Sequence, residues 1–277
     1  MLKLYILAKE TKISIFLTSK NLYLKFKMKT TWQNRSIGDL VSEDYVNAYV
    51  LNYFGIRFYD YENETLAEVC QKKGLKVESV IKELESPKNG QETELPLVTY
   101  PLDLIIEYLK YAHAVFIKHK LPYVAGLVKD FKIHPSPHEN IVKDLKLVFP
   151  LFVEDFIHHI YEEEDTLFSY INLLEQAVKG RISAAKIYFK LEQNALQKFA
   201  SEHEAHDDEM IGIRKITKDY FVDDTTPLTI KVLYHELQEF ESKLQVHARI
   251  ENEILFPKAL ALENQIRNKL FHGAKWN

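Results

Sequence analysis

The sequence predicts an all-α protein in which a small helical domain precedes an up-down-up-down four-helix bundle. Three observations indicate this fold class. Glycine and proline are scarce, with 8 and 9 residues in a chain of 277. No stretch alternates between apolar and polar residues for long enough to propose a β-sheet. From Leu102 onward, apolar residues instead recur at three- and four-residue steps, as on the buried face of a helix.

Composition and charge exclude several classes of function. The formal net charge is only −4, which argues against a dedicated nucleic-acid surface or a polybasic membrane anchor. Cys70 is the single cysteine, so an internal disulfide and a cysteine-based zinc or iron–sulfur site are excluded. No apolar run approaches the roughly 18–20 residues that cross a bilayer. We therefore expect a cytoplasmic protein that binds neither nucleic acid nor membranes.

The first residues, 1–35, are basic and partly apolar, which raises the alternative of a secretory signal. Lys9 and Glu10 interrupt the apolar stretch, and no small-residue cleavage site follows it. We expect instead a disordered segment or an upstream extension of the reading frame, with Met28 beginning the folded protein.

Turn and capping signals divide the rest of the chain into a small domain (36–86), a linker (87–101) rich in proline and polar residues, and a bundle (102–265). In the small domain, Ser42 is expected to cap a helix that runs through Asn52 and ends before Gly55. A capping box, "TLAE" at 65–68, opens the next helix, which Gly74 can stop, and 77–85 has helical spacing again.

The bundle is expected to contain four long helices. The second opens with the capping box "SPHE", is kinked by Pro150 and ends before Gly180. The helices are expected at about 102–130, 136–178, 182–220 and 228–262.

One ten-residue frame, His-x-x-x-Glu-x-x-x-Leu-Phe, occurs twice, as "HIYEEEDTLF" from His159 and as "HARIENEILF" from His247. In both copies the histidine and the glutamate (Glu163 and Glu251) occupy positions where the apolar stripe of the helix requires a core residue. Burying a carboxylate without a partner costs several kcal/mol or more, unless it is neutralised or binds a cation. The i,i+4 spacing places both side chains on one face of the helix, where they can bind the same metal.

The other two helices also direct histidine toward the core. His113 lies on the stripe of the first helix, whereas His119 should face elsewhere. His203 and His206 share the stripe of the third helix, and the phase of the stripe does not choose between them.

A set of hydrogen-bonded polar core residues is the alternative to a metal site. A single His-x-x-x-Glu pair is weak evidence, and His235 with Glu239 shows the same spacing about 120° away from His247. The repetition of the frame favours the metal site. Imidazole and carboxylate ligands suit iron, zinc or manganese, and a carboxylate can bridge two ions.

These residues resemble the ligands of the hemerythrin-like domains, which are four-helix bundles holding two iron ions. The order His-x-x-x-Glu distinguishes them from the Glu-x-x-His of ferritin-like bundles. "SEHEAHDDEMIGIRKIT" at 201–217 is similar to the third-helix segment of that domain, which makes His206 the ligand and His203 the alternative.

From about Ser36 the chain resembles one subgroup, the iron–sulfur cluster repair di-iron proteins, also called repair of iron centres proteins. Their N-terminal signature, Gly-Ile-Asp-Phe-Cys-Cys followed by Thr-Leu, is similar to "GIRFYDYENETLAEVC" here. Tyr59 and Asp60 replace the cysteine pair and Arg57 replaces the aspartate, so a role that needs that pair is in doubt. In the first bundle helix, the family histidine often falls where Ala114 stands, next to His113.

The resemblance implies two iron ions, bridged by carboxylates and expected to be oxo-bridged when oxidised. Glu163 and Glu251 would bridge them, and the terminal ligands would be His113, His159, His206 and His247. The implied role is repair or protection of iron–sulfur centres damaged by nitric oxide or oxidants in a stress response. Damaged iron–sulfur proteins would receive the iron, an electron donor is a candidate partner, and a homodimer through the small domain is one option.

Two further functions stay open. One is a di-iron sensor or store that binds dioxygen, nitric oxide or iron without catalysis, and the loss of the cysteine pair favours it. The other is an enzyme that reduces nitric oxide or peroxide with electrons from a partner. An iron donor or binding protein is expected before a classical enzyme.

Overall fold

The computed structural model describes residues 32–86, 96–131, 138–193, 196, 199 and 210–273. These residues are helical, and the β contact found among them is an isolated bridge between Ser36 and Thr65. The all-α prediction is therefore confirmed. The chain divides into two compact units, residues 1–91 and 92–277. None of the helices in the described ranges is long and apolar enough to cross a membrane.

The first unit is built from short helices whose ends follow local capping chemistry. Thr65 and Glu68 form the expected capping box, and Gly74 ends the same helix in the left-handed conformation, with φ of 68°. Both predictions are confirmed. The elements are α2 (Ile37–Glu43), α3 (Val46–Tyr53), the 3-10 turn η1 (Phe58–Asp60), α4 (Leu66–Lys73) and α5 (Val77–Leu84).

The expected helix starting at Ser42 is wrong. Ser42 lies inside α2, which begins earlier because the Ser36 side chain accepts a hydrogen bond from the Asp39 amide. A second polar side chain, Asp44, accepts from the amide of Val46 at 3.0 Å and starts α3. Two capping side chains so close together divide one apolar pattern into two helices.

The core of the first unit requires one close backbone approach. A Cβ atom on Gly38 would lie 2.9 Å from the carbonyl oxygen of Glu62, to which the Gly38 amide donates at 2.8 Å. Glycine is therefore needed there. Cys70 is buried in this core, and burial raises the pKa of its thiol, so it packs as a small apolar residue. Tyr59 and Asp60 lie on the turn η1.

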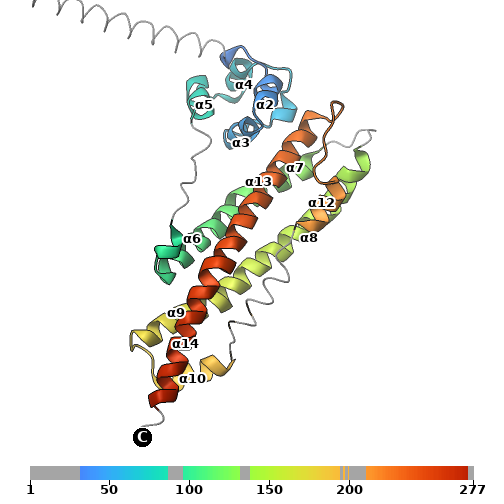
Figure 1. The fold of residues 1–277 in the computed structure, drawn as a ribbon. Coiled ribbons are helices and arrows are strands. Elements are labelled where there is room, and N and C mark those ends of the chain that lie inside the picture. Colours follow the sequence, from blue (N-terminus) through green and yellow to red (C-terminus); the bar gives the residue numbers. More distant parts are fainter. Residues whose placement is uncertain are drawn as a thin grey trace, which may run out of the picture. The chain divides into compact units, whose positions relative to one another are not determined.

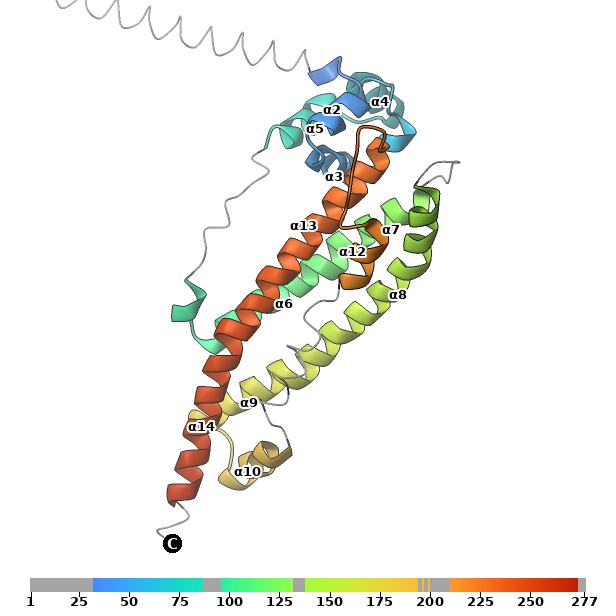
Figure 2. The same ribbon diagram turned by 45° about the vertical axis from the view of Figure 1, so that its right-hand side comes forward.

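The described residues of the second unit include three long helical segments, each interrupted by one π-helical turn. In Figures 1 and 2 the first runs opposite to the other two, and contacts join α7 to α8 and α13, and α9 to α14. The segments are α6 (Leu102–Val115), η3 (Phe116–Lys120) and α7 (Leu121–Asp130); α8 (Glu139–Glu163), η4 (Glu164–Phe168) and α9 (Ser169–Val178); and α13 (Leu228–Ile250), η5 (Glu251–Leu255) and α14 (Phe256–Gly273).

One predicted helix end requires correction, and one predicted helix start is not tested. The described part of the second long segment begins at Glu139, whereas Ser136 of the expected capping box lies outside the described residues. The last segment continues to Gly273, beyond the expected end near 262, because Glu263 and Ile266 remain buried. Gly180, with φ of 69°, follows α9 as predicted.

The expected third bundle helix falls partly outside the described residues. Its described parts are α10 (Ala184–Gln193) and α12 (Ile211–Thr217). A separate 3-10 turn, η2 (Leu97–Thr99), precedes α6. Contacts join α12 to α8 and α10 to α9 and α14. The four-helix arrangement itself stays a prediction.

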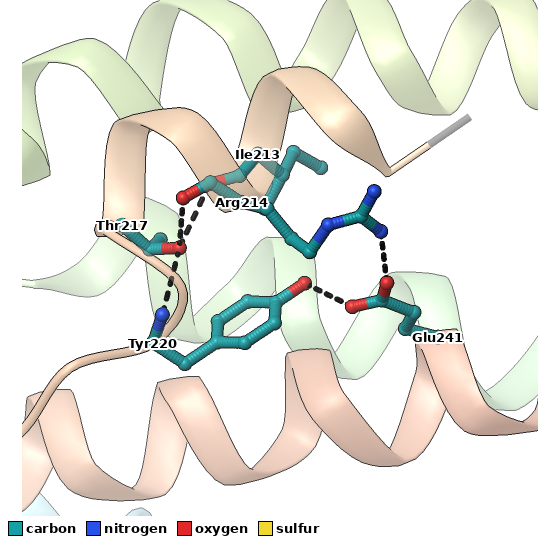
Figure 3. A network of polar contacts seen from close by, with 5 residues as sticks. All are labelled: Ile213, Arg214, Thr217, Tyr220 and Glu241. Carbon is teal, nitrogen blue, oxygen red and sulfur yellow. Dashed lines mark hydrogen bonds and ion pairs between the residues drawn. The ribbon is translucent and has the colours of Figure 1, made fainter. Parts of the chain in front are cut away.

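A polar network fastens α12 to α13 (Figure 3). Arg214 pairs with one carboxylate oxygen of Glu241, and the Tyr220 hydroxyl donates to the other at 2.6 Å. Thr217 joins them, since its hydroxyl accepts from the Tyr220 amide at 3.3 Å. A carboxylate that is almost buried is thus satisfied on both oxygens.

The same network stabilises an unusual backbone turn. Lys218, Asp219 and Tyr220 have φ values of 54°, 56° and 58°, a left-handed conformation that costs roughly 1 kcal/mol or more per non-glycine residue. The hydrogen bonds of Tyr220 hold the chain in this turn before α13 begins.

Candidate metal centre

Four of the six predicted site residues lie in the interior of the second unit. His113, on α6, is 2% exposed, and Glu163, the last residue of α8, is 6% exposed. Glu251, the first residue of η5, is 1% exposed, and the His247 side chain on α13 is 11% exposed. His119 is exposed, as the helical phase predicted.

These side chains converge from three helical segments. The rings of His113 and His247 lie 4.7 Å apart between centroids. Nε2 of His113 is 3.5 Å from Oε2 of Glu163, and Nδ1 of His247 is 3.3 Å from Oε2 of Glu251. One ligand atom from each of His113, His247 and Glu251 lies within 4.8 Å of the others, close enough to share a metal ion.

The His113 ring has a defined chemical state. Its Nδ1 lies 2.8 Å from Oε1 of Glu164, a carboxylate that can only accept a hydrogen bond. Burial, and next the nearby His247, lowers the pKa of His113 to about 4, although Glu164 opposes the shift. The ring is therefore neutral near pH 7, with its proton on Nδ1 and a lone pair on Nε2.

This arrangement fits a bound cation. The Nε2 lone pair of His113 faces a carboxylate oxygen, so two electron-rich atoms oppose each other in the interior. Within the described parts of the chain, Nε2 of His113 and Nε2 of His247 are buried without a hydrogen-bond partner. Buried polar atoms are normally satisfied. A metal ion would satisfy both nitrogens and neutralise the facing carboxylates.

Two apolar layers enclose the cluster. On one side, Phe168 and Leu255 belong to a core that runs along α6, α9 and α14. On the other, Phe116 contacts the His247 ring edge-on at 6.0 Å and continues into a group of phenylalanines. Neighbouring rings in that group lie 5.5–6.1 Å apart; its members are Phe116, Phe149, Phe152, Phe156 and Phe240. The surroundings therefore exclude water and strengthen electrostatic interactions at the cluster.

The two remaining predicted ligands, His159 and His206, stay predictions. His159 is half-buried on α8, one turn before Glu163, and the neighbouring Ile160 is the more deeply buried of the two. Its role as a ligand stays a prediction. His206 and its alternative His203 lie outside the described residues.

Sequence reasoning left one contact undecided and missed another. Glu162, Glu164 and Asp207 are all close in sequence to proposed ligands, and sequence alone cannot choose among them; the structure pairs Glu164 with His113. Phe168 stacks on His113 with centroids 5.8 Å apart and planes 5° from parallel, which periodicity alone could not indicate. The signal that could have pointed to both is their position within the repeated frame.

Comparison with known proteins gives distant similarities of one kind. The iron-sulfur cluster repair protein ScdA of Staphylococcus haemolyticus (strain JCSC1435) is 19% identical over 226 residues, covering 80% of this chain and 96% of that protein. The iron-sulfur cluster repair protein YtfE of Yersinia pestis (strain Pestoides F) is 20% identical over 197 residues, covering 71% and 83%. No protein-family model matches the chain. The chain is thus distantly similar, over most of its length, to proteins named for iron–sulfur cluster repair.

Proposed function

We propose that this chain is a cytoplasmic di-iron protein that repairs or protects iron–sulfur centres under nitrosative or oxidative stress. The iron would be held in a hemerythrin-like four-helix bundle (102–265), joined by the linker 87–101 to the small domain 36–86. The proposed ligands are the six residues with metal-binding spacing: His113, His159, Glu163, His206, His247 and Glu251.

One observation carries the proposal. His113, His247 and Glu251 gather in an apolar interior, and two imidazole nitrogens there are buried without hydrogen-bond partners among the described residues. Carboxylate and imidazole donors without thiolates suit iron better than soft metals. The similarity to ScdA and YtfE supports iron–sulfur repair as the use of that iron.

Each residue type contributes a distinct property. The imidazoles of His113 and His247 would hold the iron, and the carboxylates of Glu163 and Glu251 would offset its positive charge. The phenylalanine layer limits water, and so slows uncontrolled loss of iron. In the repair reaction iron is the cargo, which passes from this site to a recipient lacking it.

The decisive experiment has two steps. First, the metal content of protein purified anaerobically is measured, and its optical spectrum is followed after exposure to air. About two irons per chain supports the proposal, whereas zinc alone or no metal contradicts it. Second, the iron-loaded protein is mixed with an apo iron–sulfur protein and sulfide, with an equal amount of free ferrous iron as the control. Faster cluster recovery with the loaded protein than with free iron supports repair.

A di-iron sensor or store is the second candidate function. It is favoured because Tyr59 and Asp60 stand where the signature of the repair proteins has its cysteine pair. Asp60 pairs with Arg57 at 3.2 Å, and Cys70, the remaining thiol, is buried. The first unit therefore offers no accessible thiol among its described residues for redox chemistry or metal transfer. Iron that binds nitric oxide reversibly but does not reach the apo recipient would select this function.

A further inference from the structure

Two consecutive carboxylates contact opposite nitrogens of one imidazole. Glu163 approaches Nε2 of His113 at 3.5 Å, and Glu164 approaches Nδ1 at 2.8 Å. Consecutive residues of an α-helix point about 100° apart and normally serve different faces. Here the ring of His113 lies between the two side chains, so both can reach it.

The π turn η4 also contacts the face of the His113 ring. Phe168, at the end of η4, lies parallel to His113 at 5.8 Å between centroids. Glu164 opens this turn and holds the edge of the ring. Two contacts from η4, one to the edge and one to the face, therefore hold the His113 ring in place.

We propose that Glu164 is the positioning residue of the metal centre. It accepts the hydrogen bond from Nδ1–H of His113 and so directs the Nε2 lone pair toward Glu163 and Glu251. The assignment rests on the proposed metal site and adds a residue outside its ligand set. Carboxylates that fix the tautomer of a ligating histidine in this way typically change metal affinity 10- to 100-fold when removed.

The neighbouring acidic residue provides a matched control. Glu162 lies two positions before Glu164 on the same helix, but its side chain is 66% exposed and faces His158, which is 81% exposed. The Glu164 side chain is 27% exposed and its partner is 2% exposed. Removing either residue deletes one negative charge near the centre, and only one of them touches a proposed ligand.

The test measures the affinity of the full chain for ferrous iron, anaerobically, by competition with a chromophoric chelator. Glu164→Ala is expected to weaken the binding of ferrous iron 10- to 100-fold, whereas Glu162→Ala is expected to weaken it less than twofold. Glu164→Gln should recover part of the loss, because its amide oxygen can accept the same hydrogen bond. A general loss of negative charge would instead affect Glu164→Ala and Glu162→Ala alike, and that result would overturn the assignment.

A second readout uses the metal-free protein and does not depend on the yield of loaded protein. Nitrogen NMR of the imidazole of His113, assigned from its absence in His113→Gln, reports which nitrogen carries the proton. The unaltered chain should carry it on Nδ1, and Glu164→Ala and Glu164→Gln should shift part of the population to Nε2. An unchanged tautomer and unchanged iron affinity would refute the positioning role and leave the proposed function intact. If the unaltered chain binds no iron, the proposed function fails and this assignment fails with it.

Discussion

Replacing Glu251 by glutamine should have opposite effects on the metal-free and the iron-loaded protein. The side chain is 1% exposed and lies beside two imidazoles, one of them neutral. Without metal, a buried carboxylate is costly to desolvate, and an amide of the same shape is less so. The metal-free Glu251→Gln protein should therefore be at least as stable as the unaltered protein.

In the presence of iron, the Glu251→Gln protein should instead be less stable than the unaltered protein. At free iron 100 times the dissociation constant, binding stabilises the folded state by about 2.7 kcal/mol. For a unit of this length that raises the melting temperature by roughly 5–11 °C. If the loss of a ligand weakens binding about 100-fold, the same free iron concentration equals the new dissociation constant. The stabilisation then falls to about 0.4 kcal/mol, and the rise in melting temperature to roughly 1 °C.

The assay is thermal unfolding with and without ferrous iron under anaerobic conditions, followed by circular dichroism. Glu253→Gln is the control, because Glu253 lies in the same turn η5 but is exposed, and it should keep the full shift. Equal iron-induced shifts in Glu251→Gln and Glu253→Gln would refute the reasoning. So would a loss of about 3 kcal/mol or more in metal-free Glu251→Gln, which would mean that the carboxylate is structural.

Three further predictions concern stability away from the metal centre. Glu241→Ala should lower the free energy of unfolding by about 2–3 kcal/mol in urea titrations, since an almost buried ion pair and a tyrosine hydrogen bond are lost. As a control, Glu239→Ala, at an exposed position, should change it by less than about 0.5 kcal/mol. Tyr234→Phe should raise stability by about 1 kcal/mol at pH 8, because the Tyr234 hydroxyl is buried without a hydrogen-bond partner among the described residues. Burial raises the pKa of Tyr234 to about 12, so stability in the unaltered protein should fall as pH rises from about 10 to 12, and less so in the variant; equal alkaline losses would contradict this. Gly126→Ala lies inside α7 with open space at its Cβ, so it should raise the free energy of unfolding by about 0.5–1 kcal/mol. Gly180→Ala, at a φ of 69°, should lower it by a similar amount. A change of the same sign in both variants would contradict the argument from backbone conformation.

The features that sequence predicted well are those decided by nearby residues. The capping box at Thr65 and the helix ends at Gly74 and Gly180 depend on side chains and backbone within one turn. The burial of Glu163 and Glu251 also followed from local periodicity, because a stripe of apolar neighbours has to face the core.

Where competing local signals existed, sequence reasoning failed. Ser36, Ser42 and Asp44 are all acceptable caps, and only the tertiary position of α2 determines which ones are used. The placement of His159 is a different case, because its role as a ligand stays a prediction. A stripe drawn through His159 is as regular as one drawn through the adjacent Ile160 of α8. The structure buries Ile160 more deeply, a difference of phase that a few residues of periodicity do not resolve.

Two of the three π-helical turns, η4 and η5, explain why the ten-residue frame ends in Leu-Phe. A π turn closes its hydrogen bond one residue later than an α turn, so positions i+4 and i+5 both lie near the face of residue i. In η4, Glu163 is followed at these positions by Leu167 and Phe168, both buried.

In the second copy the π turn begins one residue earlier in the frame, at the glutamate itself, and the Leu-Phe pair is again buried. In η5, Glu251 is followed by Leu255 and Phe256, which are 0% and 3% exposed. A regular α-helix would turn one residue of each Leu-Phe pair away from the core. The wider turn allows a buried carboxylate and two apolar side chains to share one face, so that Phe168 can stack on His113 beside the carboxylates. The frame therefore combines the π turn with the positions of the proposed ligands, and the buried Leu-Phe pair is as much a part of the candidate site as the histidine and the glutamate.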